Sequence, residues 1–229
     1  MTRTQMETYI KQTFKRTDKD TEIRQAIDDT LRDISTRHSF QVLMSQSYVP
    51  SVSGIEDYPL PSNLIHLHRP IRLLHGSATG DSGKNLTELT KTEYDLIEPN
   101  PNRTNPTTGE PWGYTIWSNS ILLTPIPDAG AYLFEINWGK AITVPTAAGD
   151  TVGPFHVTWD ETIKWGCLSR LYETVEMIDM ADKFGAYYEL GRPVILGGEV
   201  MDREGGIANM IAADKDLVSQ IGRVVNNSL

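Results

Sequence analysis

The sequence predicts an α+β fold: a helical bundle, made of an N-terminal hairpin and a long C-terminal helix, with a β-rich insert and a C-terminal extension. Apolar residues recur at helical spacing through the first forty residues and again from about residue 158, whereas short β-branched and aromatic runs separated by prolines lie between them. We therefore expect a helical hairpin over 1–40, a β-rich insert over 41–152, a long helix packing on the hairpin over 153–190, and a C-terminal excursion and helix over 191–229.

The first part is predicted to form two amphipathic helices, over about 4–16 and 21–37. A polar break separates them, and Asp18 or Asp20 is expected to accept the free amide hydrogens that open the second helix. The two helices should form a hairpin. The apolar positions that define them recur at helical spacing: Met6, Ile10, Phe14, Ile23, Ala26, Ile27, Leu31 and Ile34.

The middle part has the composition of a sheet with turns. The dipeptide at 118–119 separates two strand-like runs and predicts a tight hairpin. A mixed helical pattern over 87–97 predicts a short helix, and the polar stretches 76–85 and 99–111, rich in Gly and Pro, predict exposed loops. The candidate strands are 46–52, 58–60, 64–74, 113–117, 120–124 and 132–138.

The third part should begin with a capping box, because Thr158 is followed three residues later by Glu161. Gly191 and Pro193 predict where the helix ends, so it should span about thirty residues. An irregular segment that contains several glycines follows, and then a last amphipathic helix. The apolar face of the long helix is formed by Ile163, Cys167, Leu168, Leu171, Val175, Ile178, Ala181, Phe184 and Tyr188, and that of the last helix by Ile207, Ile211, Leu217, Val218, Ile221 and Val224.

Composition argues against several classes of function. The 229 residues carry a net charge of −9, which leaves no basic composition for gripping duplex DNA, and no apolar run reaches the length of a membrane helix. The single cysteine, Cys167, cannot form an intrachain disulfide, and the first residues lack the apolar stretch of a signal peptide. We therefore expect a protein made and used in a reducing cytosol.

The Gly-rich stretch 76–85 (GSATGDSGKN) invites interpretation as a phosphate-binding loop, since Lys84 could reach a phosphate. The spacing does not fit. A Walker A sequence ending at Lys84 would need glycine at 78 and Ser or Thr at 85, where this chain has Ala78 and Asn85. An exposed loop is the favoured interpretation.

The histidines, the cysteine and the helical carboxylates that could suggest a metal site or catalysis each have a structural explanation. His66 and His68 would share one face of a strand, but two ligands do not make a metal site. Cys167 lies on an apolar helix face, which favours a buried structural thiol over a nucleophile. We therefore expect no catalytic residue, no cofactor and no metal. The helical carboxylates are expected to form solvated or intersubunit ion pairs with neighbouring arginines: Asp28, Asp29, Asp33, Glu173, Glu176, Asp179 and Asp182.

Aromatic residues concentrate in the middle part, where most should fill the core. Any that face outward would mark a protein contact surface, because exposed aromatics within a polar rim are typical interface anchors. The residues are Trp112, Tyr114, Trp117, Tyr132, Phe134 and Trp138.

Four phrases resemble the head-to-tail adaptor family of tailed bacteriophages, whose members are tail tubular protein A-like. IDDTLRDISTRHSFQVLMSQ (27–46) resembles its second helix and the strand that follows, and EDYPLPSNLIHLHRPIRL (56–73) resembles its strand pair. ILLTPIPDAGAYLFEINWGKAI (121–142) resembles its hairpin, and WDETIKWGCLSRLYETVEMIDMADKFGAYYEL (159–190) its long helix. The resemblance extends to about residue 190. The chain departs from the family at 191–229, which is longer and richer in glycine.

The resemblance implies a structural virion protein at the head-tail interface, made in the host bacterial cytoplasm. It implies a ring of about twelve copies of the chain under the portal protein, joined below to a tail, nozzle or tail-hub protein. Double-stranded DNA would pass through the bore without sequence-specific binding, and no membrane is involved. The polar loops at 76–85 and 99–111 would then contact the tail or the neighbouring subunit.

The C-terminal part is our candidate for portal contact, and its removal is expected to abolish portal binding. Two alternatives remain open: a stopper or tail-completion protein of the same neck, which a partner pull-down would separate, and a small hydrolase or nucleotide-binding protein, which would need an acid, base or phosphate cradle. The candidate portal-contact residues are Arg192, Val194, Ile195, Leu196, Val200, Met201, Ile207 and Ile211.

Overall fold

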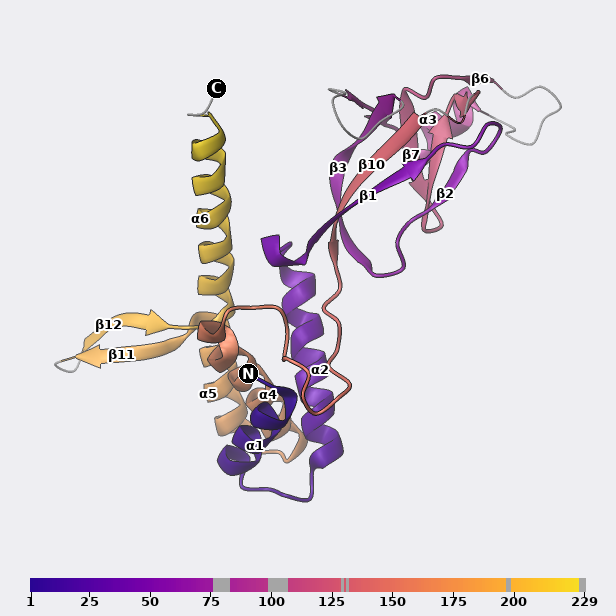
Figure 1. Ribbon diagram of the computed structural model, residues 1–229. Helices are drawn as coiled ribbons and strands as arrows, with labels where there is room; N and C mark the ends of the chain where they lie inside the picture. The colour runs from indigo at the N-terminus through magenta and orange to yellow at the C-terminus, as the bar shows by residue number, and fades with distance from the viewer. Residues whose placement is uncertain (76–82, 99–106, 129, 131, 197–198, 227–229) are drawn as a thin grey trace. The chain divides into compact units, whose positions relative to one another are not determined.

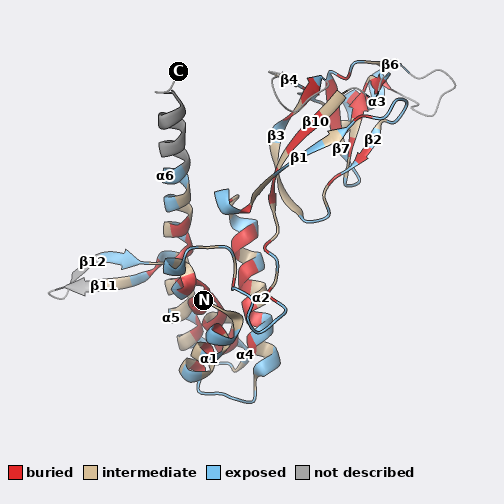
Figure 2. Cartoon of the chain, in the orientation of Figure 1, coloured by how far each residue is buried: buried red, intermediate tan, exposed pale blue. Residues whose placement is uncertain are grey.

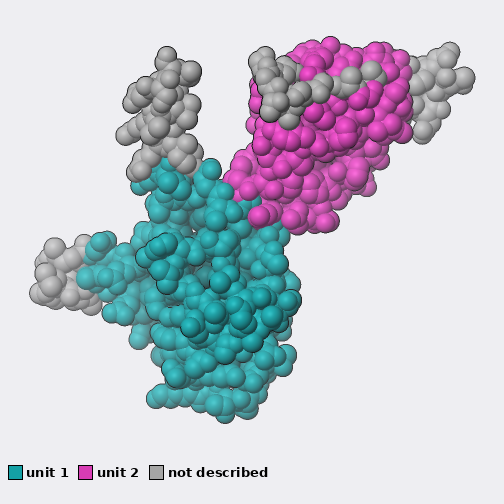
Figure 3. All heavy atoms as spheres, viewed as in Figure 1, with its two compact units in different colours: residues 1–43, 141–229 teal, residues 44–140 magenta. Residues whose placement is uncertain are grey.

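The computed structural model divides the chain into two compact units (Figure 3). Unit 1 consists of Met1–Leu43 and Ala141–Leu229, and unit 2 of Met44–Lys140. The structure describes residues 1–75, 83–98, 107–128, 130, 132–196 and 199–226, of which 195, 196, 199–201 and 218–226 are described by their backbone alone.

Helices dominate unit 1 and strands dominate unit 2, which confirms the predicted α+β class (Figure 1). The helices are α1 (Arg3–Phe14), α2 (Asp20–Arg37), α3 (Lys91–Ile97), α4 (Asp160–Thr174), α5 (Ile178–Leu190) and α6 (Ile207–Asn226), with short 3-10 helices at Gln41–Leu43 and Val157–Trp159. The strands are β1 (Met44–Pro50), β2 (Asp57–Pro59), β3 (Leu64–His75), β4 (Lys84–Asn85), β5 (Thr87–Glu88), β6 (Thr108–Gly109), β7 (Gly113–Trp117), β8 (Ser120–Thr124), β9 (Ile126–Pro127), β10 (Tyr132–Lys140), β11 (Arg192–Leu196) and β12 (Glu199–Glu204).

Unit 1 is organised around α4, which packs against α1, α2 and α5. Gly166 lets these helices approach closely, since a Cβ at this position would lie 2.6 Å from Thr30 Cγ2 and 2.9 Å from Tyr188 Cδ2. Any larger residue would therefore force the helices apart. Figure 2 shows the buried residues of α2 in red along the part of the helix that faces this core.

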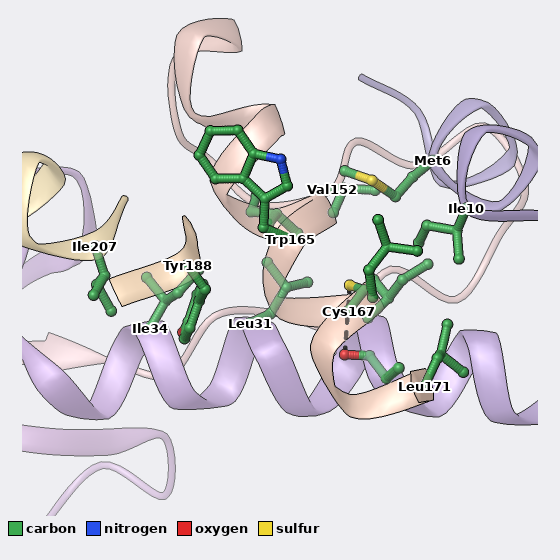
Figure 4. Close-up of a cluster of buried hydrophobic side chains, with 14 of the residues drawn as sticks. Met6, Ile10, Leu31, Ile34, Val152, Trp165, Cys167, Leu171, Tyr188 and Ile207 are labelled. Carbon is green, nitrogen blue, oxygen red and sulfur yellow. Dashed lines mark hydrogen bonds between the residues drawn. The ribbon is translucent and has the colours of Figure 1, made fainter. Parts of the chain in front are cut away.

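The core of unit 1 is aliphatic and aromatic, and Cys167 lies within it (Figure 4). Its thiol is fully buried and sits 3.6 Å from both the Ala26 carbonyl oxygen and Thr30 Oγ1. Burial raises the pKa of the Cys167 thiol to about 12. A thiol that stays protonated is a poor nucleophile, so the prediction of a buried structural cysteine is confirmed.

The predicted single helix of about thirty residues is wrong, because α4 and α5 are separate helices. The chain turns at Glu176, whose φ of 57° lies in the left-handed region. There the Met177 amide donates to the Tyr172 carbonyl at 3.0 Å and the Glu176 amide to the Glu173 carbonyl at 3.1 Å. This is a Schellman ending with Glu in the position that glycine usually occupies, so the helix end could not be predicted from the residue types.

The predicted capping box at Thr158 is also wrong. The backbone already turns in the 3-10 helix that contains Thr158, so this residue is not the extended cap of α4. Its amide instead donates to His156 Nδ1 at 3.4 Å, and Glu161 accepts a hydrogen bond from Lys164 Nζ at 2.6 Å. Capping boxes form at Thr2, before α1, and at Thr90, before α3.

The cap predicted for α2 is also wrong. No side chain caps the start of this helix. Asp18 accepts two hydrogen bonds of 2.8 Å from Arg16, and Asp20 lies in the first turn, where it pairs with Lys11 at 2.8 Å. Acidic residues still lie near the positive end of the helix dipole, as the sequence suggested.

Unit 2 is a sandwich of two sheets, in strand orders β1-β10-β3-β4 and β2-β8-β7-β5, with a small β6-β9 pair beside them. Its core is drawn from the inner faces of both sheets. At the predicted hairpin between β7 and β8, Ser118 and Asn119 have φ of 50° and 65°, the geometry that a two-residue hairpin turn requires. The core residues are Tyr58, Leu60, Ile71, Leu73, Leu86, Tyr114, Ile121, Leu123, Phe134, Ile136 and Trp138.

The chain enters unit 2 in β1 and leaves it in β10, and these two strands are antiparallel neighbours. Met44 is paired with Gly139, so the two points of insertion lie side by side. Unit 2 can therefore be inserted in the chain without separating the halves of the helical core.

Candidate assembly surfaces

The structure supplies no evidence of a metal centre. In the described part of the chain, no group of three or more His, Cys, Asp or Glu residues lies close enough together to hold a metal ion. His66 and His68 both lie in β3, and burial together with the neighbouring His66 lowers the pKa of His68.

The most distinctive surface feature of unit 1 is the antiparallel pair of strands β11 and β12, residues 192–196 and 199–204, which we call the arm. Glycines form its base. Gly191 has φ of 86°, and Gly205 and Gly206 have φ of 68° and 82°, conformations that other residues rarely adopt. A Cβ on Gly206 would lie 2.2 Å from the Gly191 nitrogen, so the two ends of the arm cross in direct backbone contact.

Hydrogen bonds hold this base to the helices. The Gly206 amide donates to Thr162 Oγ1 at 2.9 Å, which ties it to α4. Asn209 Nδ2 donates to the Gly205 carbonyl at 2.8 Å, and Arg203 Nη1 to the Gly191 carbonyl at 3.2 Å. The base of the arm therefore has a specific, bonded conformation rather than being a simple linker.

The first turn of α6 is part of the core of unit 1. Ile207 and Met210 are only 3% and 2% exposed, and Ile211 packs against the same core. Deletion of 191–229 would thus uncover apolar surface as well as remove a contact site. Of the candidate portal-contact residues, Arg192, Val194, Ile195, Leu196, Val200 and Met201 lie in the arm, and Ile207 and Ile211 lie in this turn.

An apolar groove of about 230 Å³ runs beside α6. One polar contact spans it, since Asp214 accepts a hydrogen bond from the Gln41 amide at 2.9 Å and lies 3.0 Å from His38 Nε2. This contact holds α6 to the segment that follows α2. The groove is lined by Phe40, Val42, Pro154, Phe155, His156, Trp159, Met210, Ala213, Asp214 and Leu217.

Two of the aromatic residues singled out in the sequence face outward from unit 2. Trp112 is 39% exposed and Trp117 is 56% exposed, and Lys91 Nζ lies 5.5 Å from the centre of the Trp117 ring. Tyr114, Phe134 and Trp138 are buried, and Tyr132 is partly buried against the same core. Core filling thus explains most of the cluster, and the two exposed tryptophans are candidate contact residues.

The two polar stretches lie partly outside the described residues. Residues 76–82 and 99–106 are not described, whereas Lys84 lies in β4 and 108–109 in β6. Lys84 Nζ lies 3.4 Å from Glu110, so the described ends of the two stretches are joined by an ion pair.

Two of the helical carboxylates singled out in the sequence, Asp29 and Asp33, pair with arginines, and Asp29 lies 3.9 Å from Arg32. Asp33 accepts a hydrogen bond from Tyr188 Oη at 2.6 Å and from Arg37 Nε at 3.0 Å, and Arg170 Nη2 lies 3.4 Å away. Burial alone would raise the pKa of Asp33, but the hydrogen bonds from Tyr188 and Arg37 outweigh it and lower the pKa. These carboxylates stabilise helix packing.

Unit 2 contains a more deeply buried carboxylate. Glu135 is 6% exposed and accepts hydrogen bonds from Gln46 Nε2 at 2.8 Å, Asn137 Nδ2 at 3.0 Å and Arg72 Nη1 at 3.0 Å. The hydrogen bond from Asn137, with those of Gln46 and Arg72, lowers the pKa of Glu135 against the effect of burial. A carboxylate with three donors is ionised and structural.

Two separately packed units, a glycine-based arm and exposed apolar surfaces are features of a protein that works by assembling with other proteins. Comparison with known families agrees. Residues 1–195 match the family model described as SU10 adaptor protein, so the chain belongs to the SU10 adaptor protein family. The family is one of bacteriophage structural adaptor proteins, components of the virion. A search of curated proteins finds no match to the chain. None of the described helices is long and apolar enough to span a membrane.

Proposed function

We propose that this adaptor closes into a ring of about twelve copies that joins the portal vertex of the capsid to the tail. The family supports the adaptor role, and the resemblance of the four sequence phrases supports the position below the portal. In this proposal the chain has no catalytic duty, and its residues act by burying surface against copies of itself and against its neighbours.

The single observation that carries the proposal is the match of most of the chain to the adaptor family. The family match ends at residue 195, within the arm, so the region that begins with the arm and continues through α6 lies mostly beyond the match and is where this chain can differ in how it meets its partners. We assign portal contact to this region, with Arg192 and Val194 as the described arm residues that take part. The stretches 76–85 and 99–111 are assigned to the tail protein or the neighbouring subunit.

The net charge suits a DNA passage. Each copy carries −9, so a ring is strongly acidic and repels the phosphate backbone. Duplex DNA would then slide through the bore without being held, which is what transfer from head to tail requires.

Portal binding by a truncated chain tests the assignment. Removal of 218–229 leaves Ile207 and Met210 in the core, whereas removal of 191–229 would take them away. The candidate portal-contact residues all lie within 192–211, so we expect the chain ending at Leu217 to keep both its helical content by circular dichroism and its portal binding in a pull-down. The same chain with Arg192→Ala and Val194→Asp should keep its helical content but lose portal binding. A Trp117→Ala chain is the matched control, since its exposed side chain lies in unit 2. Full portal binding by the doubly substituted chain would contradict the assignment.

A further inference from the structure

Strand β1 forms one edge of its sheet. The order β1-β10-β3-β4 leaves β1 paired on one side only, and its seven residues keep an uninterrupted register with β10. The edges at β2, β4 and β5 are only two or three residues long. Among the described strands of unit 2, β1 is thus the longest open edge.

The direction of the free backbone groups of β1 follows from one hydrogen bond. The Ser51 amide donates to the Tyr132 carbonyl at 2.8 Å, and the register places these two residues opposite each other. Bonded pairs recur at every second residue of an antiparallel ladder, so the main-chain groups of Met44, Gln46 and Tyr48 point away from β10. Within the described residues, no other main-chain group takes up these outward amides and carbonyls.

This edge also lacks the usual devices that prevent strand pairing. Its sequence, MSQSYVP, has no charged residue, and its pairing with β10 has no bulge. Natural edges are commonly protected by lysines, bulges or short length. Pro50, which has no amide hydrogen, limits further pairing only at the end of the strand. The edge is therefore suited to accept another strand.

The arm is a pair of strands that a third strand would stabilise. It consists of the five-residue β11 and the six-residue β12, and its main contact beyond its own strands is with α5. Two strands alone are marginally stable in water, and a third strand stabilises them. β11 and β12, with five and six residues, are short enough to pair along the seven residues of β1.

We propose that the open edge of β1 is a docking site for the arm of a second copy of this chain. This inference rests on the proposed ring. The contact joins two different surfaces, unit 2 of one copy and the arm of the next, which is the head-to-tail relation that a closed ring needs. Pairing of β1 with β1 would give only a dimer. The acidic residues of β12 oppose arm-to-arm pairing, whereas the uncharged β1 does not.

Disulfide trapping between two chains that each carry one introduced cysteine tests the contact directly. Tyr48→Cys places a thiol on the open edge, and Asp202→Cys places one on β12, at positions that are both exposed. The natural Cys167 is buried and does not interfere. We expect a mixture of the two chains to form an intermolecular disulfide. The control mixture of Trp117→Cys with Asp202→Cys, which probes the other sheet of unit 2, should form little.

Absence of the Tyr48→Cys to Asp202→Cys disulfide, or an equal yield in the control mixture, would overturn the proposal. So would a disulfide that forms only when both cysteines are on one chain, since the arm would then pair within its own copy.

A matched pair of edge variants sharpens the test. Each variant, Gln46→Pro or Gln46→Thr, is added to the Tyr48→Cys chain. Both substitutions remove the side-chain amide of Gln46, which donates a hydrogen bond to Glu135. Only proline also removes an outward main-chain N–H. We expect proline to lower the disulfide yield about fivefold relative to threonine. Equal yields would overturn the proposal. The measurement needs no portal protein, so its failure is distinct from a failure of portal binding.

Discussion

The two units of this chain are stabilised in different ways. Unit 1 has a helical core in which apolar side chains meet across close-packed helices, and its ion pairs lie near the surface. Unit 2 has a separate core between two sheets and buries a carboxylate, Glu135, on the outer side of one of them. No residue that the structure describes belongs to both cores. The difference indicates an inserted domain that carries its own stability, so each unit can be changed without rebuilding the other.

The largest expected effect comes from truncating one core residue in each unit. Leu31 in unit 1 and Leu123 in unit 2 are both fully buried, and replacing either with alanine should cost about 2–5 kcal/mol. Hydrogen exchange should then speed up mainly in the unit that carries the substitution. If either variant accelerates exchange equally in both units, the two cores are coupled and the comparison fails.

A smaller effect is expected at the base of the arm. Gly206→Ala introduces a Cβ that collides with the Gly191 backbone at a φ of 82°, which should cost at least about 1–2 kcal/mol locally. Gly149→Ala is the matched control, because nothing lies within 4 Å of its new methyl group. We expect faster exchange of the amides of the arm and of the first turn of α6 in Gly206→Ala alone. Equal exchange in the two variants would show that the glycine crossing is not needed.

The smallest effect is expected for Glu135→Gln, at about 1 kcal/mol, because glutamine fills the same space but loses the charge that three donors bind. The folded pKa of Glu135 lies below 4.5, so its charge stabilises unit 2 above that pH, and the stabilisation is lost as pH falls through the folded pKa.

Wild-type unit 2 should therefore lose more stability than the Glu135→Gln variant when denaturant unfolding is repeated at decreasing pH below 4.5. Parallel pH profiles for the two chains would contradict the assigned role of Glu135. The comparison uses the difference between the chains, so acid effects on other carboxylates cancel.

Periodicity predicted the elements well where one face is buried. The spacing of Met6, Ile10 and Phe14 identified α1, and the runs at 113–117 and 120–124 coincide with β7 and β8. The break between α4 and α5 could not be predicted, because Glu176 adopts the left-handed conformation while apolar positions continue on both sides of it. The prediction of a capping box at Thr158 was wrong for a similar reason. Thr158 lies within the 3-10 helix before α4 and so cannot be the extended cap residue, and composition alone does not reveal this 3-10 helix.

The contact surfaces were less predictable than the elements. The sequence indicated that exposed aromatics would mark contacts, but not which of them are exposed, because Trp117 and Tyr114 lie in the same strand. The glycines at 191, 205 and 206 indicated breaks in regular structure, but the sequence does not show that their backbones contact each other in the fold. The open edge of β1 emerges only from strand order, which local sequence does not encode.

Electron microscopy of the full chain mixed with its portal protein tests the central claim most directly. The account predicts a closed ring of adaptor copies seated on the portal, with unit 1 and unit 2 each visible as separate bodies in every subunit. Particles in which the portal carries no adaptor ring, under conditions where both proteins are folded, would contradict it.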